Sequence, residues 1–115
     1  MLNKSARLTS SSDFARATKS GLRVATDNFV GYLYLTGSDE VAKAGLIISK
    51  SVGGSVVRHR IARQARHAIA SEITKLPAGA LFVLRANSKA AAADFAVEIS
   101  QILNRLVDKS AKVSQ

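Results

Sequence analysis

Residues 46–67, LIISKSVGGSVVRHRIARQARH, decide how this chain folds. An apolar run of strand length meets two glycines, and a helical pattern starts directly after them. Val57, Ile61 and Ile69 recur along one side of that pattern, together with small alanines. The stretch therefore predicts a strand, a sharp break and an amphipathic helix over about residues 55–75.

The predicted helix is strongly basic. Four arginines fall within nine positions, with no acidic residue among them: Arg58, Arg60, Arg63 and Arg66. The whole chain has 17 Lys and Arg against 8 Asp and Glu, which gives a formal net charge of +9. A charge this large attracts polyanions, and phosphate backbones are the commonest of them. Because a merely solvated face usually mixes both signs, the pattern favours a binding surface.

The length and composition limit the class of protein. The chain has 115 residues, enough for one domain and too few for two ordinary ones. We expect one domain over residues 1–115, with an ordered core over about residues 6–107 and a frayed tail. The absence of cysteine excludes disulfides and thiolate metal sites. Since neither a membrane-length apolar stretch nor a secretory signal is visible, we expect a cytoplasmic protein.

The other elements follow from periodicity and turn residues. Side chains alternate along residues 29–36, so that Tyr32 and Tyr34 share the less apolar face of a strand. Residues 44–49 are continuously apolar, which predicts an inner strand. The remaining segments are a helix over 12–20, a strand over 80–84 and a final helix that begins within 86–95. This order predicts an α+β fold, with one sheet backed by helices.

The ionisable residues give little support to catalysis by the protein. The acids are scattered along the chain, and the one adjacent pair, Asp39 and Glu40, lies in an expected turn. His59 and His67 have no carboxylate close in sequence that would orient them as general bases. Neither a metal-ligand spacing nor a phosphate-binding loop motif is present. We therefore predict no catalytic residue and no metal site in the protein.

Binding of a polyanion fits these residues better. Arginine presents a planar fork of donors that matches phosphate oxygens in pairs. Lys50 follows the apolar strand, and the glycines let a backbone approach the helix N-terminus, where free amides attract anions. Tyr32 and Tyr34 could stack unpaired bases, and Phe14 would join them if the first helix lies along their side of the sheet. The alternative for all three rings is ordinary packing.

The segment AGLIISKSVGGSVVRHRIARQARHAI, residues 44–69, resembles the signature of the bacterial ribonuclease P protein component. That signature reads approximately V-G-hydrophobic-x-V-S-K-K-x-G-x-A-V-x-R-N-R-x-K-R-x-x-R. The flanks are similar over about residues 6–107, in the segments RLTSSSDFARATKSGLRV, NFVGYLYL and ALFVLRA. The chain departs from the signature at three positions, because His59, Ser51 and Ala62 replace an Asn and two Lys. These departures affect individual contacts with RNA more than they affect membership in the family.

The resemblance implies a fold and a function. The fold would be an α/β sandwich, with a sheet of about four strands, three helices and a left-handed crossover between parallel strands. The protein would be the non-catalytic subunit of a ribonucleoprotein endoribonuclease whose RNA cuts the 5′ leader from precursor tRNA. Mg²⁺ would serve the holoenzyme and be held mainly by RNA. The partners would be the catalytic RNA and precursor tRNA, with no membrane and no protein partner inferred.

The resemblance also implies two sets of RNA-binding residues. The first set would bind the catalytic RNA: Lys50, Arg58, His59, Arg60 and Arg63. The second set would bind the leader, with Tyr34 included because it shares the face of Tyr32: Phe14, Tyr32, Tyr34, Lys50 and Arg66. A small basic ribosomal or ribosome-associated protein remains the alternative function. A DNA-binding helix is less favoured, because the basic helix follows a strand rather than a helix-turn-helix pattern; a protein-only nuclease is the last alternative.

Overall fold

The computed structural model describes residues 6–87 and 94–113 of the chain. Its helices and strands are α1 (Ser11–Ser20), β1 (Leu22–Ala25), β2 (Phe29–Leu35), β3 (Lys43–Ile48), α2 (Ser55–Glu72), β4 (Ala80–Ala86) and α3 (Phe95–Val113). Two short 3-10 turns flank α2, namely η2 (Lys50–Val52) and η3 (Ile73–Lys75). The helices predicted over residues 12–20 and 55–75 and the strands predicted over 29–36 and 80–84 are confirmed.

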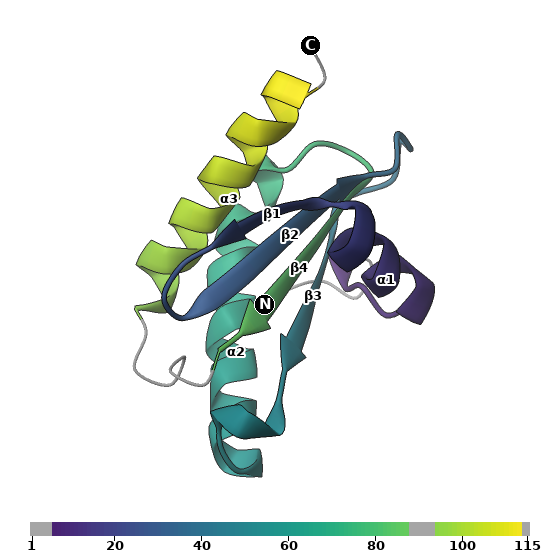
Figure 1. Ribbon diagram of the computed structural model, residues 1–115. Coiled ribbons are helices and arrows are strands. Elements are labelled where there is room, and N and C mark those ends of the chain that lie inside the picture. The colour runs from purple at the N-terminus through teal and green to yellow at the C-terminus, as the bar shows by residue number, and fades with distance from the viewer. Residues whose placement is uncertain (1–5, 88–93, 114–115) are drawn as a thin grey trace.

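The four strands form one mixed sheet, in the order β1-β2-β4-β3. β2 pairs antiparallel with β1 and with β4, whereas β3 and β4 run parallel. The chain passes from β3 to β4 through α2, which lies behind the sheet in Figure 1, with β3 to the right of β4 and both strands running downward. This crossover is left-handed, as the resemblance implies, although right-handed crossovers are the general rule.

The prediction that residues 44–49 form an inner strand is wrong. β3 lies at the edge of the sheet, and β4 takes the inner position between β2 and β3. β3 is nevertheless apolar because both of its faces are covered. Ala44 and Leu46 pack into the core on the side of α2, while Gly45 and Ile47 lie on the side of α1. A continuous apolar run therefore indicates burial of both faces rather than a central place in the sheet.

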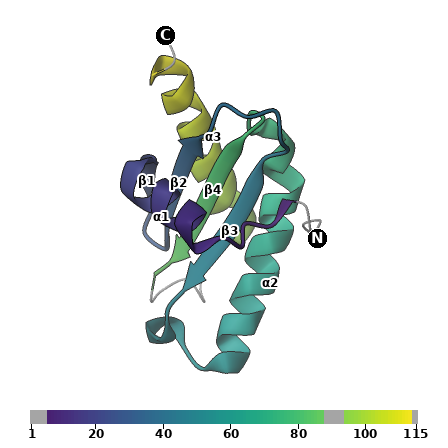
Figure 2. The same cartoon turned by 90° about the vertical axis from the view of Figure 1, so that its right-hand side faces the viewer.

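Helices cover both faces of the sheet. α2 and α3 pack together on one face, and Figure 2 shows α1 on the side opposite α2. The larger core lies between the sheet and the α2–α3 pair, and its fully buried side chains include Phe29, Leu33, Phe82, Ile61 and Leu103. A smaller cluster lies under α1 and contains Leu8, Ala17, Leu81 and Val83. Tyr32 and Tyr34 pack against this smaller cluster, which confirms the alternation predicted for residues 29–36.

The ends of two segments differ from the predictions. The sequence analysis assigned no strand to the residues of β1, because a strand of four residues shows little periodicity. The described part of α3 begins at Phe95, and the portion of its predicted start that falls on residues 88–93 lies outside the described residues. α3 continues to Val113, so residues 108–113 of the tail are helical, and its fraying stays a prediction. Ser110 is buried in this last part, which ties it to the fold.

Candidate nucleic-acid interface

The junction between β3 and α2 is the first part of the candidate interface. Lys50 lies exposed in η2, and Gly53 has a φ of +153°, which side chains rarely adopt. A Cβ on Gly53 would also lie 3.0 Å from side-chain atoms of Val57. α2 then starts at Ser55 with no acidic residue in its first turn and no side-chain cap from the described residues. The amides and the positive dipole end of α2 therefore favour an anion at this junction.

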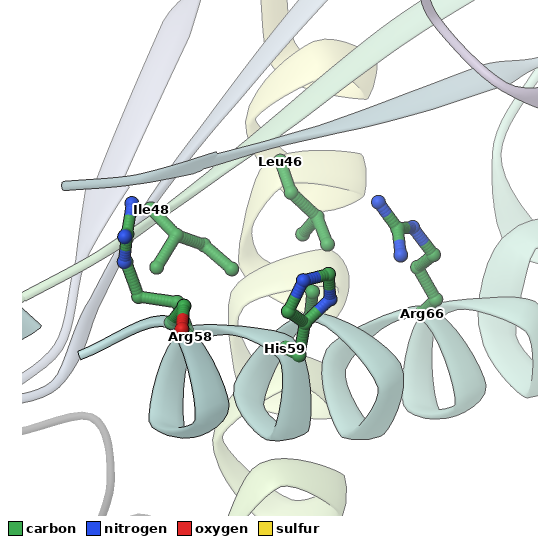
Figure 3. A pocket seen from close by; sticks show the side chains of 7 residues that line it. Leu46, Ile48, Arg58, His59 and Arg66 are labelled. Atoms are coloured by element: carbon green, nitrogen blue, oxygen red, sulfur yellow. The ribbon is translucent and has the colours of Figure 1, made fainter. Parts of the chain in front are cut away.

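A groove of about 350 Å³ lies between α2 and β3, and we call it the α2–β3 groove. Its lining consists of Leu46, Ile48, Ser55, Arg58, His59, Ala62 and Arg66. Figure 3 shows Arg58, His59 and Arg66 rising from α2 toward Leu46 and Ile48 of β3. The strand thus supplies an apolar wall, and the helix supplies the nitrogen-bearing groups that face it.

Arg58 has an unsatisfied donor in this groove. Its side chain is half-buried, and its Nε is shielded from solvent without a hydrogen-bond partner among the described residues. A buried donor left unpaired costs roughly 1–3 kcal/mol. The two Nη groups of the same guanidinium, rather than Nε, are the donors suited to phosphate oxygens. Contact of Arg58 with RNA stays a prediction.

The other basic side chains of α2 point elsewhere. Arg63 and His67 line a separate hollow of about 1060 Å³, between α2 and the first residues of α3. Arg60 is exposed. The basic helix therefore presents cations in more than one direction, and the α2–β3 groove collects only part of the first predicted set. Contact of Arg60 and Arg63 with RNA stays a prediction.

The second part of the candidate interface is the sheet face beside α1, which we call the aromatic face, made of Phe14, Tyr32 and Tyr34. Phe14 lies on the backbone of Gly45, so closely that a Cβ at Gly45 would collide with its ring. The two tyrosines pack against the small cluster under α1. All three residues are half-buried, so ordinary packing accounts for part of each ring. Stacking of a base on these residues stays a prediction.

Arg16 extends the aromatic face along α1. Its guanidinium lies over the ring of Tyr34, and its Nη1 lies 3.4 Å from Oδ1 of Asp13. Interaction with the Tyr34 side chain, chiefly hydrogen bonding, raises the pKa of Arg16 above its ordinary value, and Asp13 adds to this effect. Like arginines in proteins generally, Arg16 is a cation at neutral pH.

The family model described as Ribonuclease P matches residues 2–111. The chain belongs to the ribonuclease P protein family. The ribonuclease P protein component of Acidothermus cellulolyticus is 41% identical over 110 residues, which cover 92% of each chain. That of Nocardia farcinica is 35% identical over 127 residues, which cover 92% of this chain and 81% of the relative. The ribonuclease P protein of Staphylococcus aureus has the same fold, with a TM-score of 0.73 at 23% identity, over 93% of this chain and 96% of that one.

Membership in the ribonuclease P family settles the class of function. The chain is the protein component of a ribonucleoprotein endoribonuclease and takes part in maturing the 5′ ends of tRNA. The ribosomal, DNA-binding and protein-only nuclease alternatives are set aside by this assignment.

In this ribonuclease P protein the two parts of the interface adjoin through β3. Gly45 touches Phe14 on one face of the strand, and the next residue, Leu46, lines the α2–β3 groove on the other. Arg66, predicted with the leader-binding set, lies in that groove rather than beside the tyrosines. Lys50, a member of both predicted sets, lies exposed in η2 beyond the end of β3.

Two cations near the aromatic face were not predicted. The sequence did not indicate the role of Arg16, because its contact with Tyr34 joins α1 to β2, which are separate in sequence. Arg85 of β4 is exposed, and it lies between Val30 of β2 and Ile47 of β3 in the sheet register. The alternation of residues 80–86 could have placed Arg85 on the face of Leu81 and Val83, since all three have the same parity.

Neither a metal centre nor a membrane span is found in the part of the chain that the structure describes. Over residues 6–87 and 94–113, no three His, Asp or Glu side chains lie close enough to hold a metal ion together. Within the same ranges, no helix is both long and apolar enough to cross a lipid bilayer.

Proposed function

We propose that this subunit assists ribonuclease P by holding two RNA segments on adjoining surfaces. The α2–β3 groove and its surroundings bind the catalytic RNA, and the aromatic face binds the single-stranded 5′ leader of precursor tRNA. The observation that carries the proposal is the arrangement around β3. A half-buried arginine with an unpaired Nε lies on one side of this strand, and three half-buried aromatic residues lie on the other.

Phosphate contacts account for the first surface. Arg58 and His59 line the groove, Lys50 precedes it, and Arg60 and Arg63 continue the positive charge along α2. Guanidinium groups bind phosphate oxygens through paired hydrogen bonds, so this surface suits a folded RNA backbone. His59 would donate one hydrogen bond where the family signature has an amide.

Stacking accounts for the second surface. Phe14, Tyr32 and Tyr34 present ring surface on one sheet face, and every base has a π-face that such rings accept. Lys50 and Arg66 would neutralise the phosphates of the leader where it passes the edge of β3. This surface grips an unpaired strand largely without reading its sequence, which suits leaders of different sequence.

In this proposal the catalytic chemistry belongs to the RNA. Mg²⁺ ions held by the RNA would supply the activated water and stabilise the charge that develops during phosphodiester cleavage. The protein binds and orients RNA, and we place this work in the cytoplasm, without a membrane or a protein partner.

Reconstitution tests the proposed function. The protein is added to ribonuclease P RNA from the same genome at low Mg²⁺, and cleavage of precursor tRNA is measured in single turnover. We expect faster cleavage, and we expect Tyr32→Leu to weaken binding of precursor tRNA at least about fivefold while mature tRNA binding stays unchanged. Leu35→Ala, an exposed apolar change on the same strand, is the control. Equal losses for both tRNAs would remove the leader from the proposal.

A further inference from the structure

A second basic surface lies on the opposite edge of the sheet, where β1 meets α3. A hollow of about 440 Å³ there is lined by Arg23, Val24, Ala25, Arg105, Asp108 and Lys109. We call Arg23, Arg105 and Lys109 the β1–α3 basic surface. All three are exposed, and Asp108 is the one acid of the lining. The hollow thus carries an excess of positive charge outside the interface described above.

Among the described residues, none of the three cations of this surface takes part in an ion pair. The ion pairs found among the described residues are Arg16–Asp13, Lys43–Glu40 and Lys75–Glu72. Glu98 of α3 precedes Arg105 by two helical turns, but its two oxygens already accept from Thr26 Oγ1 at 2.8 Å and from Asn28 Nδ2 at 2.6 Å. Lys109 donates to the Arg23 carbonyl oxygen at 3.0 Å, which leaves two of its three N–H donors.

The position of this surface separates it from the α2–β3 groove. β1 and β3 are the two edge strands, with β2 and β4 between them. Three strand spacings make about 14 Å between the edge backbones. One phosphate cannot reach both edges at once, so an anion at the β1–α3 basic surface would belong to a different part of the bound RNA.

We propose that the β1–α3 basic surface binds the phosphate backbone of a second RNA segment, so that the protein bridges two segments across its sheet. Two guanidinium forks and one ammonium group around the hollow match phosphate oxygens. Val24 is buried, so Ala25 is the exposed apolar residue of the lining, which is too little apolar surface for a protein partner. The inference rests on the proposed function only in taking RNA as the polyanion. It would hold whether the segment belongs to the catalytic RNA or to precursor tRNA.

The test compares two double variants that remove the same charge. Arg105→Gln/Lys109→Gln acts on the surface, and Arg7→Gln/Lys19→Gln removes two exposed cations outside it. Affinity for ribonuclease P RNA alone, and for its complex with precursor tRNA, is measured across a salt series. We expect the slope of log K against log salt to become less negative by roughly 1.4–1.8 for the surface variant. The control slope should not change.

Two further measurements keep the outcomes apart. Arg105→Gln alone leaves the Lys109 hydrogen bond in place, and it should change the slope by roughly 0.7–0.9 without altering thermal unfolding. In backbone footprinting, the surface variant should expose one RNA segment while the segment protected by α2 stays covered. Equal slope changes in both double variants, or no change in the footprint, would overturn the inference. A wild-type slope near zero would instead defeat the proposed function itself.

Discussion

The guanidinium carbon of Arg16 lies 4.9 Å from the centroid of the Tyr34 ring, so that a cation of α1 covers an aromatic side chain of β2. The two tyrosines of the aromatic face are therefore not equivalent. The ring of Tyr34 is covered by the Arg16 guanidinium, so a base would contact Arg16 together with Tyr34. A planar guanidinium stacks on bases as an aromatic ring does. The aromatic face thus continues from the sheet onto the helix through this pair.

Arg16→Ala should weaken binding of leader-bearing precursor tRNA by about two- to fivefold, because a cation stacked on the ring is lost. Arg16→Lys should recover only part of the loss, since an ammonium group is not planar. The measurement is fluorescence anisotropy with the reconstituted holoenzyme, with Lys19→Ala on the same helix as the control. If Arg16→Lys binds as tightly as the wild type, planarity has no role here.

Arg58→Met should shift stability and binding in opposite directions. It removes a buried, unpaired donor but keeps the apolar stem, so the free energy of unfolding should rise by up to about 1 kcal/mol. Affinity for the catalytic RNA should fall by about tenfold, since a charge-assisted contact is lost. Urea denaturation and a filter-binding assay measure the two effects. Arg63→Met, an exposed site, should leave stability within about 0.5 kcal/mol, and a loss of stability for Arg58→Met would show that Nε is satisfied in solution.

Gly45→Ala should destabilise the protein by about 1–3 kcal/mol, because the added Cβ collides with the ring of Phe14. Precursor tRNA binding should weaken as well, since Phe14 must move. Gly54→Ala is the matched control, because nothing lies within 4 Å of a Cβ there. Thermal unfolding of both variants is the measurement, and equal melting temperatures would mean that Phe14 does not rest on β3.

Glu98→Ala should lower the free energy of unfolding by about 1–3 kcal/mol. Glu98 accepts hydrogen bonds from Thr26 and Asn28, which join the β1–β2 connection to α3 across 70 or more residues of sequence. Its loss leaves both donors without their acceptor. Gln101→Ala, on an exposed position of α3, should have little effect. Amide hydrogen exchange in β1 should increase with Glu98→Ala alone; unchanged protection there would mean that α3 holds the hairpin by packing only.

Local pattern was enough to predict much of the fold. The helix of residues 55–72 follows from its apolar stripe, and the face of Tyr32 and Tyr34 follows from a period of two. Both are properties of neighbouring residues, so they do not depend on the rest of the chain. The sequence did not predict β1, because a strand of four residues shows little periodicity. It also did not predict that β3 lies at the edge of the sheet, because an edge strand covered on both faces has the same apolar run as a central strand.

Sequence by itself determined the charge, the elements other than β1, the basic helix and, through its signature motif, the ribonuclease P family. Tertiary structure decided which side chains meet: Arg58 and Arg66 with β3, Phe14 with Gly45, Arg16 with Tyr34, and Arg23 with Lys109. The physical reason is that periodicity fixes only the direction of a side chain from its own helix or strand. Its neighbours depend on strand order and on which sheet face each helix covers, and long-range packing sets both.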